Sequence, residues 1–209
     1  MGYINDHKVL TVIKTEEISI PEYTGSYNVT ANGTLSTANK KMTQDLVVNV
    51  ASSGVDVVST YDATIPNSAM RNLNITSYTS ETNTRIEGNC FWGCASLEKV
   101  YIPNGFLYDN SHFRECTSLK SVYLKGVTNY GIGRYAFYNC NSLQKVALAN
   151  PDGVVPLNYT GYDTIPRLTP PIKFYVPSSL IASYQTATNW STLYNNGYIT
   201  FEDIANWGD

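Results

Sequence analysis

FWGCASLEKVYI, residues 91–102, is the stretch that decides the fold, because the chain contains its pattern three times. The pattern returns as FRECTSLKSVYL at residues 113–124 and as FYNCNSLQKVAL at residues 137–148. Its shared form is F-x-x-C-x-S-L-x-x-V-x-[IL], and the copies begin 22 and 24 residues apart. A self-similar unit at a period of this length is typical of proteins that are built from stacked coils.

Each copy is too short to bury its own apolar face, so successive coils have to stack and share one core. The V-x-[IL] segment of each copy has the two-residue period of a β-strand, which turns both of its apolar residues to one side. We therefore expect short parallel strands about 4.8 Å apart. Their inward side chains are predicted to be Val100, Ile102, Val122, Leu124, Val146 and Leu148.

Equivalent residues of stacked coils should form columns. The repeat predicts one column of Phe91, Phe113 and Phe137, in which each buried ring contributes about 1.5–3 kcal/mol. A fourth, divergent coil is predicted at IKFYV, residues 172–176, after an excursion that is rich in proline. An irregular first coil is predicted around residues 73–86.

The chain has four cysteines, at positions 90, 94, 116 and 140, which disulfides, a metal site or simple burial could explain. Three of them, Cys94, Cys116 and Cys140, occupy the same repeat position. A small, unbranched apolar side chain fits that position, so burial accounts for them without further chemistry. Cys90 and Cys94 lack the second pair of ligands that a tetrahedral zinc site needs, so we expect no metal.

Length and composition exclude several classes of protein. With 209 residues the chain can bury a sizeable core. Its net charge is −3 and it has no long run of basic residues, which argues against nucleic-acid binding. Apolar runs such as residues 46–50 are far shorter than the roughly 20 residues that a membrane span requires, so no membrane insertion is expected.

The repeat resembles the BspA-like leucine-rich repeat family, whose units carry Ala-Phe before the Cys-Ser-Leu run. RYAFYNCNSL, residues 134–143, matches that pattern closely, whereas Cys90 and His112 stand where the alanine would be. The chain end is similar to the family's terminator, with YVPSSL at 175–180 and then Tyr184, Ala187, Trp190 and Tyr194. The resemblance implies a mainly β fold, a short leucine-rich-repeat solenoid with a small C-terminal helical cap, over residues 54–209. A helix start at Pro177-Ser178 agrees with that cap.

Residues 1–53 are different in kind and are predicted to form a small N-terminal β module. Its expected strands are residues 8–13, 18–20, 27–30 and 45–50, with a linker at 51–54. Residues 23–48 resemble a segment, Y-x-G-x-Y-x-V-T followed by T-L-x-T-x-x-K-x-M-x-x-D-V-x-V, of structural proteins of tailed phages that infect Gram-positive bacteria. A polar β-hairpin of the kind found in many surface proteins is the alternative interpretation.

This second resemblance implies a phage virion structural protein of the tail, baseplate or capsid decoration. The N-terminal module would anchor it to the particle, and the repeats would project for adhesion or receptor binding. Residues 1–8 lack the features of a signal peptide, which favours assembly in the cytoplasm of the host bacterium. The expected partners are other virion proteins and a host cell-surface glycan or protein. We expect a homo-oligomer, with a trimer as one arrangement. The alternative function is a bacterial cell-surface adhesin of the BspA-like type.

No catalytic constellation is apparent, so we expect neither an enzyme nor a cofactor. The two histidines, His7 and His112, belong to different modules, and His112 takes the place of Ala136 in the next coil. A histidine-based triad or metal centre would require both of them to converge. We predict that His112 is a partly buried residue of its coil.

A candidate binding surface lies on the outward side of the predicted strands, where repeat proteins commonly present extended surfaces. The residue between the two core positions is Tyr101, Tyr123, Ala147 and then Tyr175. Beside these run Lys99, Ser121, Lys145 and Lys173. We hypothesise that Lys99, Tyr101, Tyr123, Lys145 and Tyr175 bind a ligand or partner. The alternative is that these tyrosines are simply good strand formers on a solvated sheet.

Overall fold

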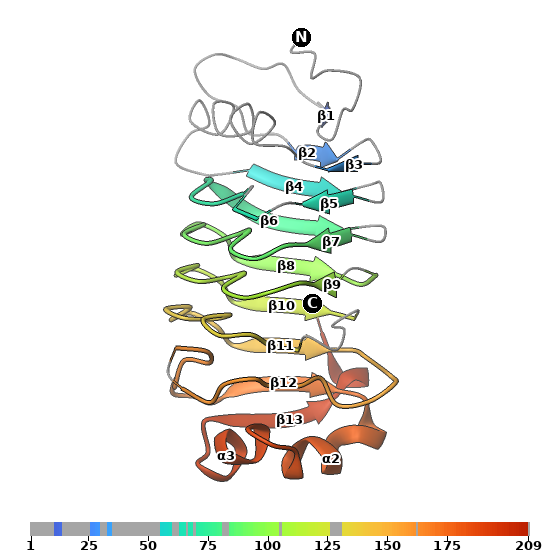
Figure 1. Ribbon diagram of the computed structural model, residues 1–209, viewed down its shortest axis with the longest axis vertical. Coiled ribbons are helices and arrows are strands. Elements are labelled where there is room, and N and C mark those ends of the chain that lie inside the picture. The colour runs from blue at the N-terminus through green and yellow to red at the C-terminus, as the bar shows by residue number, and fades with distance from the viewer. Residues whose placement is uncertain are drawn as a thin grey trace.

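The computed structural model describes residues 11–13, 26–29, 33–34, 55–59, 63–65, 67–68, 70–80, 84–104, 106–125, 131–161 and 163–208. Successive coils of the chain lie over one another and form a stack of strands (Figure 1). Within the described ranges, the structure has no helix with the length and apolar character needed to cross a membrane.

Within the described residues, the larger of two sheets has nine strands in the order β1-β2-β4-β6-β8-β10-β11-β12-β13. Among these strands only β1 and β2 pair antiparallel, and every later neighbour is parallel, as consecutive coils require. The strands are β1 (Thr11–Ile13), β2 (Ser26–Val29), β4 (Val55–Ser59), β6 (Ile75–Ser80), β8 (Lys99–Ile102), β10 (Ser121–Leu124), β11 (Lys145–Leu148), β12 (Ile172–Val176) and β13 (Ile199–Asp203).

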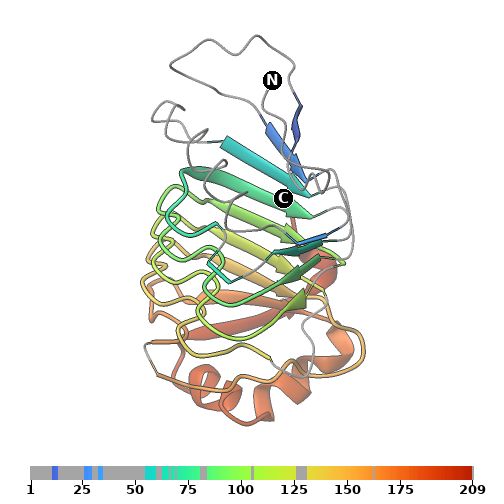
Figure 2. The same ribbon diagram turned by 45° about the horizontal axis from the view of Figure 1, so that its top comes forward.

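A second, parallel sheet covers another side of the stack (Figure 2). It contains β3 (Gly33–Thr34), β5 (Ala63–Ile65), β7 (Thr84–Ile86) and β9 (Phe106–Leu107). Each of the coils from β4 to β9 therefore consists of a strand of the large sheet, a short strand of the small sheet and a turn. This second sheet was not predicted, because strands of two or three residues are too short to show an alternation of apolar and polar side chains.

The predicted strand register is confirmed. Val122 lies opposite Val100 on one side and Val146 on the other, so equivalent repeat positions are direct neighbours. The six predicted inward side chains are all buried. The fourth coil is confirmed as well, because β12 pairs in parallel with β11 and turns Ile172, Phe174 and Val176 into the core.

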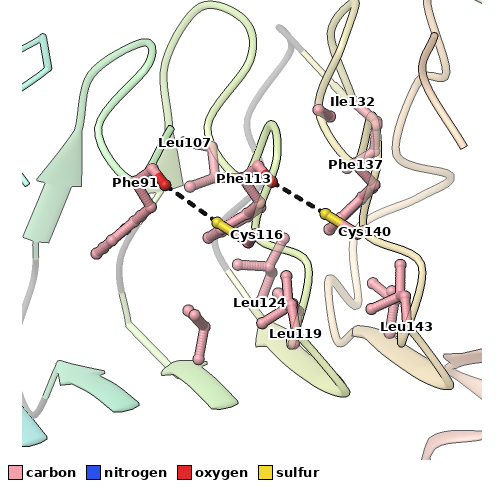
Figure 3. Packing of buried hydrophobic residues seen from close by; sticks show 14 of the residues in the cluster. Phe91, Leu107, Phe113, Cys116, Leu119, Leu124, Ile132, Phe137, Cys140 and Leu143 are labelled. Carbon is pink, nitrogen blue, oxygen red and sulfur yellow. Dashed lines mark hydrogen bonds between the residues drawn. The ribbon is translucent and has the colours of Figure 1, made fainter. Parts of the chain in front are cut away.

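The phenylalanine column is also confirmed (Figure 3). The rings of Phe91 and Phe113 stack with centroids 5.6 Å apart, and those of Phe113 and Phe137 with centroids 5.5 Å apart. Cys94, Cys116 and Cys140 lie buried beside this column, and all four cysteines are free thiols. Met70 takes the aromatic position one coil earlier, where its main-chain carbonyl accepts a hydrogen bond from Cys94 Sγ, 2.9 Å away.

In each repeat turn the chain bends at two residues whose backbone is in the left-handed conformation, with positive φ. Asn89, Ser111 and Tyr135 have positive φ two residues before the phenylalanine, and Gly93, Glu115 and Asn139 have it two residues after. These turns are tied to the next coil by main-chain hydrogen bonds, such as Phe91 N to the carbonyl of His112 at 2.9 Å. The backbone of each turn is therefore paired although it forms no strand.

The predicted helical cap is confirmed and closes the end of the stack beyond β13 (Figure 1). It comprises η1 (Ser178–Leu180), α2 (Ile181–Thr186) and α3 (Trp190–Asn195), and η2 (Ile204–Asn206) follows β13. Trp190 and Tyr184 are fully buried, and both bind the segment between β11 and β12. Val155 N donates to Tyr184 Oη at 2.9 Å, and Trp190 Nε1 donates to the carbonyl of Val155 at 2.7 Å. A solenoid needs such a cover because its last coil would otherwise expose its core.

The front of the chain can be compared with expectation in its described strands. Strand β2 pairs in parallel with β4, so the large sheet includes residues on both sides of residue 53. Strands β1 and β2 overlap the strands expected at residues 8–13 and 27–30, whereas those expected at 18–20 and 45–50 lie outside the described residues. The division into residues 1–53 and 54–209 remains a prediction.

Candidate functional site

The outward side of the large sheet carries the two rows that the sequence analysis proposed. The tyrosine row consists of Tyr101, Tyr123, Ala147 and Tyr175, in register on β8, β10, β11 and β12. The lysine row runs beside it on the same strands and consists of Lys99, Ser121, Lys145 and Lys173. The three tyrosines, Lys99 and Lys145 are partly buried, and Lys173 is exposed.

Tyr101 and Tyr123 form the closest pair of the tyrosine row. Their ring centroids are 4.8 Å apart and the rings are inclined by 37°. Burial, followed by the neighbouring Tyr101, raises the pKa of the Tyr123 hydroxyl, so it remains a neutral hydrogen-bonding group. The pair presents a continuous amphipathic surface of two rings and two hydroxyls.

The C-terminal segment fills the gap at Ala147. In the register of the sheet, Ala147 lies between Tyr123 and Tyr175. The ring of Trp207 lies 5.6 Å from that of Tyr123 and 5.2 Å from that of Tyr175, edge-on to both. Ala147 is consequently 0% exposed although it points outward. The aromatic surface is thus continuous from β8 to β12, with an indole in place of the missing tyrosine.

Lys145 holds this segment in place. Its Nζ lies 4.2 Å from the centroid of the Trp207 ring and donates a hydrogen bond to the carbonyl of Gly208. Of the five residues proposed as the binding site, Lys145 is therefore engaged within the chain itself. Trp207 was missed in the sequence analysis, and the only signal for it was the single small residue, Ala147, in an otherwise aromatic row.

The two rows continue onto the neighbouring strands with smaller side chains. Ser77 and Thr79 on β6 are in register with Lys99 and Tyr101. At the opposite end, Thr200 and Glu202 on β13 are in register with Lys173 and Tyr175. The cationic and aromatic part of the surface is therefore limited to the strands β8 to β12.

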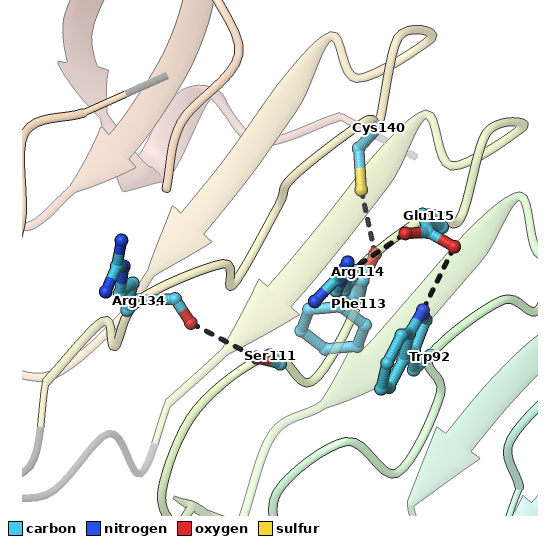
Figure 4. Close-up of polar contacts among 7 residues, drawn as sticks. All are labelled: Trp92, Ser111, Phe113, Arg114, Glu115, Arg134 and Cys140. Carbon is cyan, nitrogen blue, oxygen red and sulfur yellow. Dashed lines mark hydrogen bonds and ion pairs between the residues drawn. The ribbon is translucent and has the colours of Figure 1, made fainter. Parts of the chain in front are cut away.

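A second group of aromatic and charged side chains follows the repeat turns (Figure 4). The guanidinium groups of Arg71 and Arg114 lie 3.6 and 4.3 Å from the Trp92 ring centroid. Trp92 Nε1 donates to Glu115 Oε2 at 3.0 Å, and Arg114 Nε pairs with Glu115 Oε1 at 3.0 Å. The hydrogen bond from Trp92 is the main cause that lowers the pKa of Glu115. Because these contacts join successive coils, the cluster stabilises the stack, and this accounts for it without a binding role.

The remaining candidates for chemistry are buried. His112 is 1% exposed, more deeply buried than predicted, with Nε2 2.8 Å from the carbonyl oxygen of Tyr108. Burial lowers its pKa to about 4, so the ring is neutral at physiological pH. Burial also raises the pKa values of the Cys116 and Cys140 thiols. In the part of the chain that the structure describes, no group of three or more His, Cys, Asp or Glu side chains is arranged to hold a metal ion.

Comparison with known families identifies the repeat. Residues 58–158, a little under half of the chain, match the family model described as BspA type Leucine rich repeat region, in six copies. The predicted resemblance to this type of repeat is confirmed. No curated protein and no solved structure matches the chain. The match does not include residues 23–48, so the resemblance to phage structural proteins stays a prediction.

Proposed function

We propose that this chain, whose centre is a BspA-type leucine-rich repeat region, is an adhesion protein that binds its target through the tyrosine and lysine rows. One observation carries the proposal: outward aromatic rings lie in register on successive parallel strands, with Tyr101 and Tyr123 4.8 Å apart. Side chains that repeat at every coil form an extended surface, and extended surfaces suit adhesion.

The composition of the surface supports recognition. Tyrosine offers a large contact area at a small cost in conformational entropy, and its hydroxyl can donate or accept a hydrogen bond. Lys99 and Lys173 add positive charge beside the rings. By contrast, His112 and the four cysteines are buried. Binding without catalysis is therefore the function that we propose.

The setting of this adhesion protein is a finer proposal. The sequence of residues 23–48 supports a virion structural protein that assembles in the bacterial cytoplasm, is anchored through its N-terminal part, and contacts other virion proteins. In this setting we propose a homo-oligomer that forms through the N-terminal part. The alternative is a bacterial cell-surface adhesin, which the BspA-type repeat itself favours. The gene neighbourhood separates the two settings, since capsid and tail genes indicate a virion and sortase and transporter genes indicate a cell surface.

Adhesion is tested by binding of the fluorescently labelled full-length chain to a panel of Gram-positive cells. We expect saturable binding to some strains, which an excess of unlabelled protein competes away. Binding that is equally weak on every strain and is not competed would contradict an adhesion function. Light scattering on the same preparation tests the oligomer, and a monomer at high protein concentration would contradict that part of the proposal.

A further inference from the structure

We infer that the ligand of the tyrosine and lysine rows is an acidic polysaccharide, and that Trp207 is part of its binding surface. This inference rests on the proposed adhesion function and names the class of ligand. Three features carry it: the sign of the charge on the surface, the spacing of the rings, and the paired state of the strand backbones.

The charge of the surface is opposite to that of the chain. The chain has a net charge of −3, yet the lysine row places three lysines on β8, β11 and β12. Lys145 and Lys173 are direct cross-strand neighbours, an arrangement in which like charges destabilise a sheet. Lys145 is partly compensated by Trp207 and the carbonyl of Gly208, whereas Lys173 is exposed. An anionic ligand would relieve this repulsion.

Carboxylates border the positive region. Asp56 on β4 is in register with Ser77, two strands from Lys99, and accepts hydrogen bonds from Thr76 and Ser77. Glu98, which precedes Lys99, forms an ion pair with Lys120 at 2.7 Å, so its charge is neutralised by a residue outside the rows. Glu202 extends the tyrosine row on β13 and marks the end of the positive region.

The rings repeat along the axis of the stack. Successive centroids from Tyr101 through Tyr123 and Trp207 to Tyr175 are 4.8, 5.6 and 5.2 Å apart. A surface that repeats at each coil is matched by a ligand that repeats in the same direction, and a polysaccharide offers one sugar ring after another. The apolar faces of the sugars would pack on the aromatic rings, while acidic groups pair with Lys99 and Lys173.

The state of the strands argues against an extended peptide as the ligand. A peptide that joins a sheet uses the free N–H and C=O groups of an edge strand. Strands β8, β10, β11 and β12 each have a partner on both sides, so their backbones offer no such groups. Recognition at this surface therefore has to use side chains, and these combine rings with positive charge.

The test compares an acidic polymer with its neutral form. The full-length chain is titrated with polygalacturonate and with its fully methyl-esterified form, in low salt and in 0.5 M NaCl. Binding of the acid form that weakens strongly in high salt is expected, together with at least tenfold weaker binding of the ester, because exposed charges are screened by salt. The variant K99Q/K173Q should bind the acid form about five- to tenfold more weakly. W207A should weaken the binding of the acid form further.

The control variant K125Q/R134Q removes two positive charges from exposed side chains outside the rows, so its affinity should stay within about twofold of wild type. Equal binding of the acid and its ester would overturn the acidic ligand and leave adhesion standing. Equal losses for the two double variants would overturn the assignment to this surface. If the chain binds cells but not polygalacturonate, the inference fails and the proposed function survives; if it binds neither, both fail.

Discussion

Cys116 donates its thiol hydrogen to the main-chain carbonyl of Phe91, the aromatic residue of the preceding coil, with 3.0 Å between sulfur and oxygen. Cys140 makes the same contact with the carbonyl of Phe113 at 2.9 Å (Figure 3). The cysteine of the repeat is thus both a small apolar side chain and a weak donor that links coil to coil. This double requirement explains why the position holds cysteine three times.

The thiols should be inert in the native protein. Because burial raises the pKa values of Cys116 and Cys140, almost no thiolate is available for reaction. We expect Ellman's reagent to modify none of the four cysteines at pH 8 within minutes, and all four after unfolding in guanidinium chloride. A cysteine that reacts rapidly in the native protein would show that the stack is open at that coil.

The middle coil should be sensitive to a cavity. Leu119 is fully buried beside the phenylalanine column, so Leu119→Ala should lower the free energy of unfolding by about 2–5 kcal/mol. The exposed neighbour Thr117 provides the control, since Thr117→Ala removes little packing and should change stability by less than about 0.5 kcal/mol. Urea denaturation measures both variants, and equal stabilities would disprove the assigned register.

Acid should destabilise the protein through His112. The unfolded histidine takes up a proton below its ordinary pKa of 6.5, whereas burial holds the folded ring neutral until about pH 4. The contribution of the neutral His112 ring to the free energy of unfolding is therefore fully present above pH 6.5 and is lost as the pH falls toward 4. At pH 5 the free energy of unfolding has fallen by about 2 kcal/mol because of this group. Asp109 and the carbonyls of Tyr108 and Ile86 oppose the shift but do not reverse it.

The variant His112→Ala isolates this effect, because alanine occupies the equivalent position 136 in the next coil. Its stability should fall about 2 kcal/mol less than that of wild type between pH 7.5 and pH 5. Parallel stability curves for the two proteins would mean that the histidine is not buried in its neutral form.

Gly131 should tolerate no side chain. It has a φ of +65°, and a Cβ built there would overlap the main-chain carbonyl of Pro156. Gly197 has a φ of +70° with nothing within 4 Å of such a Cβ, so it serves as a control for backbone strain alone. Gly197→Ala should cost about 1–2 kcal/mol, and Gly131→Ala clearly more. Equal losses in melting temperature would show that the backbones at Gly131 and Pro156 are not in contact.

The strict repeat made much of the fold predictable. Once Phe91, Phe113 and Phe137 were aligned, strand register, inward side chains and both outward rows followed from the two-residue period of a strand. The first coil was recognised only as irregular because Met70 stands at the aromatic position. Strand β13 was not predicted because it lies after the cap helices, where no copy of the repeat remains.

The completed aromatic surface could not be predicted. Trp207 contacts Lys145, which lies 62 positions earlier in the sequence, and no sequence pattern connects the two residues. A contact of this kind depends on where the cap directs the C-terminal segment, which only the three-dimensional structure shows. Figure 1 shows this segment turning back from the capped end toward the middle of the large sheet.

The most direct test of the proposed binding surface is the cell affinity of the double variant Tyr101→Ala/Tyr123→Ala beside the control Tyr159→Ala. Tyr159 is 49% exposed and lies outside the rows. All three proteins should show the same circular dichroism. We predict that the double variant binds target cells at least tenfold more weakly than wild type while the control binds normally. A folded double variant with wild-type affinity would contradict recognition through these rows.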